Sequence, residues 1–261
     1  MKWRSLLVFM ILFSVISQGA SAISNQPINW GFSRSQNGQP ADAGAVLTNL
    51  LKDHDSFYRH ETKEKVLYLT FDNGYENGFT GQILDTLKKE NVPATFFVTG
   101  HYLNSATDLV KRMVNEGHIV GNHSWSHPDM TSLTDEEIRN ELKKVKEETA
   151  RITKQKEMVY LRPPRGILSA RTLSIAREEG YIHVMWSLAF VDWYTDQQKG
   201  SQYAYDNIMR QIHPGAIMLL HTVSKDNAEA LPAVIKDLKK QGYRFESLSD
   251  LSATLSGIPT L

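Results

Sequence analysis

The chain contains no cysteine among its 261 residues. This absence excludes a disulfide framework and attachment through a lipidated cysteine, so the fold must be held by its core alone. The chain also carries no net charge, with 29 Lys and Arg against 29 Asp and Glu. Such a balance gives no general attraction to nucleic acid or to an anionic membrane surface, and any recognition of anions must be local.

Internal repeats and low-complexity segments are also missing from the sequence, and the N-terminus has the pattern of an export signal. Lys2 and Arg4 precede an almost entirely apolar run at residues 6–16, and the small residues 20–22 follow it. We therefore expect a signal peptide at 1–22 that is cleaved before Ile23. The alternative is an uncleaved anchor, but the run is shorter than the ~20 residues that span a bilayer. We expect no membrane span after cleavage.

Hydrophobic residues make up 41% and charged residues 22% of the chain, which is typical of a soluble globular protein with a sizeable core. Residues 23–64 look like an extension, because 30–45 are rich in Gly, Ser, Asn and Pro. The pattern after this stretch predicts a helix that packs on the main domain. Its inner face would carry Leu47, Leu50, Leu51, His54, Phe57 and Tyr58.

From residue 65 onward, short β-branched or aromatic runs alternate with amphipathic segments, which is the pattern of repeated βα units. The predicted strands are 66–71, 94–98, 118–121, 158–161, 181–186, 216–220 and 243–245. The predicted helices are 79–90, 108–116, 134–152, 170–179, 203–211 and 228–241. This alternation predicts one α/β domain at 65–251 with a parallel, barrel-like sheet, followed by a C-terminal tail at 252–261.

Reactive side chains follow several of the predicted strands directly. Four of them come at the end of a predicted strand: Asp72, His123, Arg162 and His221. Asp192 comes shortly after the predicted strand 181–186. In parallel α/β folds the carboxyl ends of the strands meet at one edge, where active sites form. The sequence therefore predicts that these side chains lie together.

His123 and His127 are four residues apart, a spacing that lets both imidazoles reach one metal ion. Imidazole suits zinc and other borderline divalent ions. No glutamate follows the first histidine, so the motif brings no base of its own. Taken alone, two unrelated surface histidines are an equally good interpretation.

The remaining motifs are ambiguous when each is taken alone. Asp72, Asn73 and Gly74 could form a hairpin turn, although the next residues look helical rather than extended. Arg162 and Arg165 lie on a proline-rich loop that could be a solvated turn. His221 ends a very apolar strand, where a histidine more often has a structural role. Asp192 followed by Trp193 does not by itself indicate a function.

Together and in this order, these motifs resemble those of the polysaccharide deacetylases, the NodB-homology or carbohydrate esterase family 4 enzymes. The resemblance covers residues 65–251. Within the family, residues 70–78 and 213–230 look most like the peptidoglycan N-acetylmuramic acid deacetylases of spore-forming bacteria. The resemblance implies a distorted (β/α) barrel, here with an N-terminal helical extension, and hydrolysis of the amide of an acetylated amino sugar.

The resemblance also implies roles for the site residues. Asp72 would be the general base, Arg162 the cation that holds it ionised, and His221 the general acid. Asp192 would be a polar partner that supports either the catalytic histidine or the arginine. His123, His127 and Asn73 would hold one divalent metal ion. Zinc is the first candidate, with manganese, magnesium, cobalt and calcium as alternatives. Arg165, Tyr75 and Trp193 would contact the substrate.

The sequence departs from the family pattern at three positions. Asn73 stands where most members have a metal-binding aspartate, Ala189 where many have a second aspartate before Asp192, and Arg165 where an aromatic residue is common. The first two departures leave open a catalytically silent, glycan-binding relative. The retained acid and base favour catalysis, because a binding module needs neither.

The expected substrate is peptidoglycan glycan strands with their peptide stems removed, and the expected products are acetate and a free amino sugar. The muramic resemblance implies a role in forming muramic δ-lactam in spore cortex. The expected location is outside the cytoplasmic membrane, in the extracellular space, cell wall or spore envelope. A deacetylase of N-acetylglucosamine polymers is the alternative enzyme.

Overall fold

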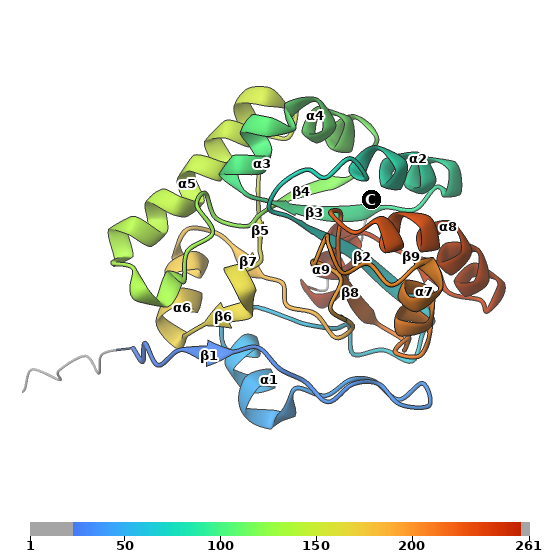
Figure 1. Cartoon of the computed structure of the whole chain (residues 1–261). Coiled ribbons are helices and arrows are strands. Elements are labelled where there is room, and N and C mark those ends of the chain that lie inside the picture. The colour runs from blue at the N-terminus through green and yellow to red at the C-terminus, as the bar shows by residue number, and fades with distance from the viewer. Residues whose placement is uncertain (1–22, 257–261) are drawn as a thin grey trace, which may run out of the picture.

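The computed structural model describes residues 23–256, so the expected export signal at 1–22 lies outside the described residues. Within them, the fold is built on a seven-stranded parallel sheet (Figure 1). Six strands follow the order β7, β5, β4, β3, β2, β8, and β9 pairs with the beginning of β2. Their bounds are β2 Val66–Asn73, β3 Ala94–Val98, β4 Ile119–Asn122, β5 Tyr160–Leu161, β7 Ile182–His183, β8 Ala216–His221 and β9 Arg244–Phe245.

Helices cover the sheet, and the N-terminal segment with β1 and α1 lies on the side away from α3 and α4 (Figure 1). The helices are α1 Gly44–Lys52, α2 Thr80–Glu90, α3 Gly100–Ser105, α4 Thr107–Asn115, α5 Asp135–Ile152, α6 Ala170–Glu178, α7 Ser201–Met209, α8 Lys225–Lys240 and α9 Leu248–Ser256. The strand β1 Ile28–Asn29 pairs antiparallel with β6 Ile167–Leu168. Two 3-10 turns, η1 Met130–Ser132 and η2 Pro164–Gly166, complete the fold. This arrangement confirms the distorted (β/α) barrel with a helical extension.

The longest helix, α5, begins with a capping box and buries one apolar face. The Thr134 hydroxyl accepts from the Glu137 backbone, and the Glu137 carboxylate accepts from the Thr134 backbone, which completes a capping box. Ile138, Leu142 and Val145 are buried along one face of α5. Burial of this stripe, rather than intrinsic propensity, supplies most of the stability of such a helix.

The helix predicted through Tyr58 ends at Lys52, and this part of the prediction was wrong. Phe57 instead forms a parallel bridge with Val184, just after β7, and Arg59 an antiparallel bridge with Ala216 of β8. The extended segment 57–59 thus fills the space between the two end strands of the sheet. Unpaired strand edges favour such pairing over one more helical turn.

This closure changes the expected domain boundaries. Backbone bonds join Phe57 N to His183 O at 3.1 Å and His60 N to Gly215 O at 2.9 Å. The last residues of the 23–64 extension therefore belong to the barrel wall. At the other end, α9 continues past residue 251 to Ser256, into the expected tail.

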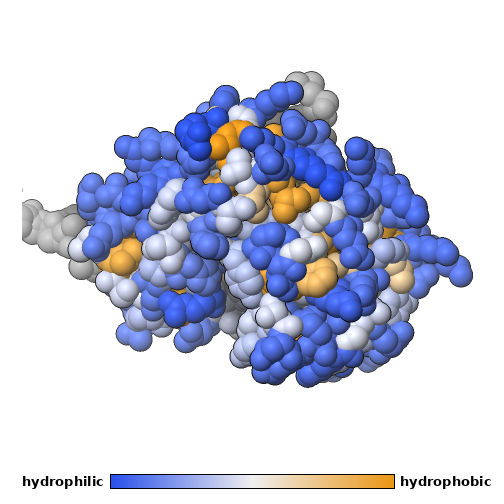
Figure 2. Space-filling view, turned by 45° about the horizontal axis from the view of Figure 1, so that its top comes forward, coloured by the Kyte–Doolittle hydropathy of each residue, from blue (hydrophilic) through white to orange (hydrophobic). Residues whose placement is uncertain are grey.

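Among residues 23–256, none of the helices combines the length and apolarity needed to cross a bilayer. Figure 2 shows a largely hydrophilic face with small apolar patches. Isolated apolar residues of this kind are normal on protein surfaces.

Closure of the barrel generates a stability prediction at Gly215. Its backbone has φ +76°, and a Cβ there would lie 2.0 Å from the His60 carbonyl oxygen. Gly215→Ala must therefore displace the closing segment, and we expect the free energy of unfolding to fall by about 3 kcal/mol. Urea unfolding at equilibrium measures this loss.

The matched control is Gly117→Ala, where φ is +86° but nothing lies within 4 Å of the added carbon. This variant should lose only the backbone strain of a left-handed residue, about 1 kcal/mol. If the two variants lose the same free energy of unfolding, the contact with the closing segment does not contribute to stability.

Candidate active site

Strand register brings the predicted reactive residues to one edge of the sheet. Asp72 lies directly opposite His221 in the pairing of β2 with β8. His123 donates its backbone N–H to Val98 O at 3.0 Å, and Arg162 donates its own to Asn122 O at 3.0 Å. Both residues thus continue the ladder just beyond their strands. Because of this register, the side chains that were predicted to lie together reach the same edge of the sheet.

Arg162 is fully buried and forms an ion pair with Asp72. Its Nη1 lies 2.8 Å from Asp72 Oδ1 and 2.9 Å from Thr70 Oγ1, while its Nε donates to Val184 O at 2.9 Å. The guanidinium also lies 4.2 Å from the ring centroid of Phe97. The planar cation is therefore surrounded by acceptors and an aromatic ring, with a longer bond from Nη2 to Met185 O at 3.4 Å.

Burial alone would raise the pKa of the Asp72 carboxyl. The nearby Arg162 guanidinium, with smaller effects of His123 and His221, outweighs burial and holds that pKa below its usual value. Asp72 is therefore ionised at neutral pH and can accept a proton. This combination of burial and pairing is typical of a general base.

The two histidines of the His123 motif face each other, with ring centroids 4.9 Å apart. His123 Nδ1 donates to Arg162 O at 2.8 Å, since a carbonyl can only accept, and this bond fixes the tautomer. Its Nε2 then carries the lone pair, 3.5 Å from Asp72 Oδ2. Burial, followed by the charge of His123, lowers the pKa of His127 to about 4.

Two imidazoles this close together, both kept neutral by burial, fit a divalent metal ion, and the carbonyl bond to His123 is the usual support for such a ligand. Within residues 23–256, no group of three His, Cys, Asp or Glu side chains is arranged to hold an ion by itself. A third protein ligand would therefore need a different donor type. The amide oxygen of Asn73, which follows Asp72 directly in the sequence, is a candidate for this ligand.

Asn73 is buried, and its two amide atoms differ in their contacts. Its Nδ2 donates to Thr222 Oγ1 at 2.7 Å, while its Oδ1 has no hydrogen-bond partner among the described residues. A buried carbonyl oxygen without a partner is costly unless something else contacts it. Asn73 is not among the residues that line the cavity described below.

His221 and Asp192 form the second half of the site. His221 Nδ1 lies 2.7 Å from Asp192 Oδ1, and the His221 backbone N–H donates to Asp192 Oδ2 at 2.9 Å. Burial lowers the pKa of His221, but the Asp192 carboxylate outweighs burial and raises it above the usual value. The Trp193 ring packs edge-on against His221 at 5.5 Å.

Asn227 is a site residue that the sequence analysis missed. Its Nδ2 donates to Asp192 Oδ2 at 2.5 Å and to His221 O at 3.2 Å. The predicted helix began at residue 228, whereas α8 begins at Lys225 and places Asn227 in its first turn. Ser224, a helix-capping residue three positions before Asn227, was the signal that could have found it.

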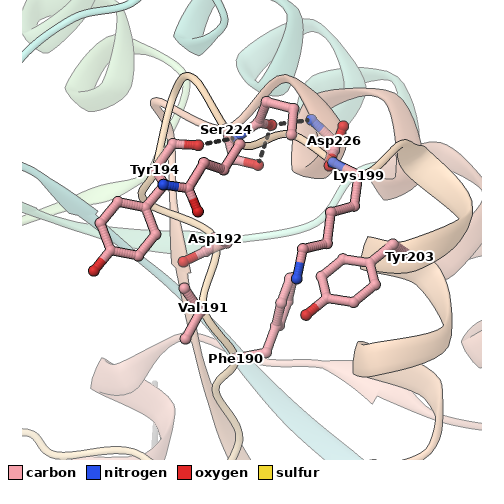
Figure 3. Close-up of a pocket in the computed structure, with 10 residues that line it drawn as sticks. Phe190, Val191, Asp192, Tyr194, Lys199, Tyr203, Ser224 and Asp226 are labelled. Atoms are coloured by element: carbon pink, nitrogen blue, oxygen red, sulfur yellow. Dashed lines mark hydrogen bonds between the residues drawn. The ribbon is translucent and has the colours of Figure 1, made fainter.

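The loop that carries Asp192 is fastened to the start of α8 (Figure 3). Asp226 Oδ2 accepts from the backbone N–H groups of Lys199 and Gly200 at 2.7 and 2.9 Å. Gln198 Oε1 accepts from Asp226 N at 3.0 Å and from Ser224 Oγ at 3.1 Å. Asp192 is thus held from both sides, by its own bonds and by those of its loop.

Most of the predicted site residues line one cavity of about 880 Å³, and these are Asp72, Tyr75, His123, His127, Arg165, Trp193 and His221. Arg162 and Asp192 lie behind it, where they contact Asp72 and His221. Tyr75 and Trp193 are each 44% exposed at this cavity. Trp125 and Trp186 also line it and were not predicted.

The cavity combines an ionised carboxylate, an imidazole with a raised pKa and two neutral imidazoles. The first can accept a proton from water and the second can donate one to a leaving group. The imidazole pair can hold an ion that polarises a carbonyl. The arrangement is suited to hydrolysis of an unreactive amide or ester.

The His221–Asp192 pair generates a prediction for stability against pH. Because the folded-state pKa of His221 is raised, the pair stabilises the fold fully below the ordinary histidine pKa. This contribution is lost as pH rises through the raised value. Asp192→Asn should therefore reduce the free energy of unfolding by more at pH 6 than at pH 9, as measured by urea unfolding at the two pH values.

Asp226→Asn is the matched control, since the partners of this carboxylate are backbone amides that do not titrate. Its destabilisation should be the same at both pH values. If Asp192→Asn lowers the free energy of unfolding equally at pH 6 and pH 9, the charged interaction between His221 and Asp192 does not contribute as predicted.

Comparison with known proteins agrees with this geometry. Residues 59–184 match the polysaccharide deacetylase family. The chain is 54% identical to the peptidoglycan-N-acetylmuramic acid deacetylase PdaA of Bacillus subtilis, over 96% of both chains. It is 59% identical to an uncharacterised 30.6 kDa protein of Geobacillus stearothermophilus, over 93% of this chain and 91% of the other.

A solved structure of Bacillus subtilis PdaA, described as a family 4 carbohydrate esterase, superimposes with a TM-score of 0.86. It shares 57% identity and covers 88% of this chain and 98% of its own. Both the sequence and the fold therefore place the chain in the polysaccharide deacetylase family, among the family 4 carbohydrate esterases.

Proposed function

We propose that this deacetylase removes the N-acetyl group from N-acetylmuramic acid of peptidoglycan strands whose peptide stems have been removed. The observation that carries the choice of sugar is Arg165, an exposed cation at the cavity. Among residues 23–256 it has no ion-pair or hydrogen-bond partner. The substrate in the name of the relative PdaA supports the same choice.

In the proposed reaction, His123 and His127 hold one divalent ion, and Asn73 contributes through its unpartnered Oδ1. When bound, such an ion polarises the acetyl carbonyl and lowers the pKa of a water molecule. Zinc is the first candidate because two imidazoles suit it, with manganese, magnesium, cobalt and calcium as alternatives.

The acid and base act on opposite sides of the acetyl group. Asp72, kept ionised by Arg162, accepts a proton from the attacking water as its oxygen bonds to the carbonyl carbon. His221, whose Nδ1 is engaged by Asp192, donates a proton to the amine nitrogen as the C–N bond breaks. The products are acetate and the free amino sugar.

Arg165 accounts for the preference for a muramyl sugar. Muramic acid differs from glucosamine by a 3-O-lactyl group, which ends in a carboxylate once its peptide has been removed. The arginine fork suits a carboxylate better than a lysine point charge. Arg162 is committed to Asp72, so Arg165 is the cation left for the substrate. An attached peptide converts the carboxylate to an amide and removes this interaction.

The proposed setting is the cell wall or spore envelope, reached by export through the signal at 1–22. There the free amine of muramic acid would allow closure of the muramic δ-lactam of spore cortex. Tyr75 and Trp193, exposed at the cavity, would contact the sugar ring. Aromatic faces of this kind pack on the apolar faces of sugars.

The proposed function is tested by incubating residues 23–261 with defined, peptide-free oligosaccharides and measuring released acetate. Acetate should appear from muramyl residues and should stop when a chelator is added. Acetate from glucosaminyl residues alone would favour the alternative deacetylase. Glycan binding with no acetate under any metal would favour a catalytically silent relative, which the amide at Asn73 and the apolar Ala189 otherwise suggest.

Arg165→Ala should reduce kcat/KM selectively on peptide-free muramyl oligosaccharides. Loss of a charge-assisted bond of about 1.5–3 kcal/mol corresponds to a fall of roughly 10- to 100-fold. Arg165→Lys should recover part of the loss, since it keeps the charge without the fork. Steady-state kinetics on muramyl and glucosaminyl oligosaccharides measure the difference.

Arg151→Ala, on the exposed surface of α5, is the control and should change neither activity. If Arg165→Ala lowers both activities equally, the pairing with the lactyl carboxylate is wrong.

Asn73→Asp should bind the divalent ion more tightly, because a carboxylate replaces a neutral oxygen beside two imidazoles. Calorimetric titration of the metal-free protein with zinc measures the affinity without reference to activity. His127→Ala should weaken binding in both backgrounds. Identical affinities for the parent and Asn73→Asp would mean that this side chain only shapes the end of β2.

A further inference from the structure

Residues 24–30 run along the loop that carries Arg165, although they lie far from it in sequence. Ile28 and Asn29 of β1 pair with Leu168 and Ile167 of β6. Figure 1 shows β1 lying beside β6 at the edge of the molecule. This short ladder begins two residues after Arg165. We call residues 24–30 the N-terminal strap.

Trp30 extends the ladder to the residues on both sides of the cavity. Its backbone N–H donates to Gly166 O at 2.9 Å, and its Nε1–H donates to Trp186 O at 3.0 Å. Its ring packs edge-on against Trp186 at 6.4 Å. Gly166 and Trp186 both line the catalytic cavity. One side chain of the strap therefore fixes two parts of the cavity wall.

The other end of the strap is fastened as well. Asn25 Oδ1 accepts from Ser169 Oγ at 2.9 Å, and Asn25 Nδ2 donates to Thr131 O at 2.9 Å. Ser24 O accepts from Arg171 N at 3.0 Å. The strap thus joins the end of the Arg165 loop to η1, which follows the His123 motif.

The Arg165 loop needs such support because its backbone is strained. Arg165 has φ +58° and ψ +9°, and Gly166 has φ +68°, so two consecutive residues are left-handed. The turn itself contributes two backbone bonds, from Gly166 N to Pro163 O at 3.1 Å and from Ile167 N to Pro164 O. A non-glycine residue persists in this conformation only where its surroundings over-determine it.

There is also no room for the loop to relax at Gly166. A Cβ at this position would lie 2.7 Å from Trp186 and 3.1 Å from Trp30. The strap and the cavity wall therefore press on the glycine from two sides. This contact, with the two Trp30 bonds, fixes the direction in which Arg165 leaves the loop.

We propose that the N-terminal strap is a positioning element for Arg165 and thereby a determinant of substrate preference. The proposal rests on the proposed function for the role of Arg165 as the residue that binds the lactyl carboxylate. The strap precedes residues 59–184, which match the family. Members with the same catalytic residues but without a strap would lack this means of directing a cation at the substrate.

The kinetic test compares Trp30→Ala with Trp30→Phe and with Phe32→Ala. Trp30→Ala should raise KM for peptide-free muramyl oligosaccharides by about threefold to tenfold, with kcat nearly unchanged, because a cation is misplaced and the acid and base are not. Trp30→Phe should recover part of the loss. Phe32→Ala removes a ring that lies beside Trp30 but leaves both Trp30 hydrogen bonds in place, and it should match the parent.

A double variant distinguishes positioning from general loosening. If Trp30 acts through Arg165, then Trp30→Ala added to Arg165→Ala should raise muramyl KM no further. Additive increases in KM would overturn the proposal. So would an effect of Trp30→Ala on kcat alone, since this would place the defect in the acid and base.

Hydrogen exchange separates a failure of the strap from a failure of the proposed function. In the substrate-free protein, Trp30→Ala should increase exchange at the amides of residues 163–168. Asn25→Ala, which removes no core volume, should change exchange in the same direction. If both variants exchange like the parent, the strap does not order the loop. If exchange increases but Arg165→Ala shows no muramyl selectivity, positioning stands and the lactyl assignment fails.

Discussion

The buried ion pair between Arg162 and Asp72 is the constraint on which the site depends. A guanidinium can be this deeply buried only when all its donors are satisfied, and here they reach β2 and the segment after β7. Removing either partner would leave a buried charge unpaired, which costs several kcal/mol. Arg162 also fixes the His123 tautomer through its backbone carbonyl. A single arginine therefore sets the charge of the Asp72 carboxyl and the orientation of the His123 imidazole.

Around this pair, the structure separates the reacting groups from the groups that hold them. Asp72, His123, His127 and His221 face the cavity, while Asp192 and Asn227 support His221 from behind. The supporting bonds come mainly from the loop after β7 and the first turn of α8. Substrate contacts come from more exposed positions. Such a division lets substrate preference change without disturbing the acid and base.

The sequence was sufficient to predict that the candidate site residues lie together, because parallel strands bring their carboxyl ends to one edge whatever the details of packing. It was not sufficient for features that depend on partners distant in the chain. Phe57 and Tyr58 continue a helical pattern, but Phe57 pairs with Val184 across the barrel. The left-handed backbone of Arg165 has no local signature, because glycine usually occupies such positions. The strands predicted at 158–161 and 181–186 are each only two residues long, β5 and β7. So short a pattern does not define where a strand begins and ends.

Closure of the barrel by residues 57–59 has a consequence for folding. The closing segment precedes every strand of the parallel sheet in the chain, yet its partners, Val184 just after β7 and Ala216 of β8, are synthesised much later. Contacts between such distant parts of a chain form slowly, because the intervening loop must first be ordered. Until then, the ends of the sheet at β7 and β8 remain open to pairing with other chains. A synthetic peptide of this segment, added in trans, would compete for those edges only in molecules that have not yet closed.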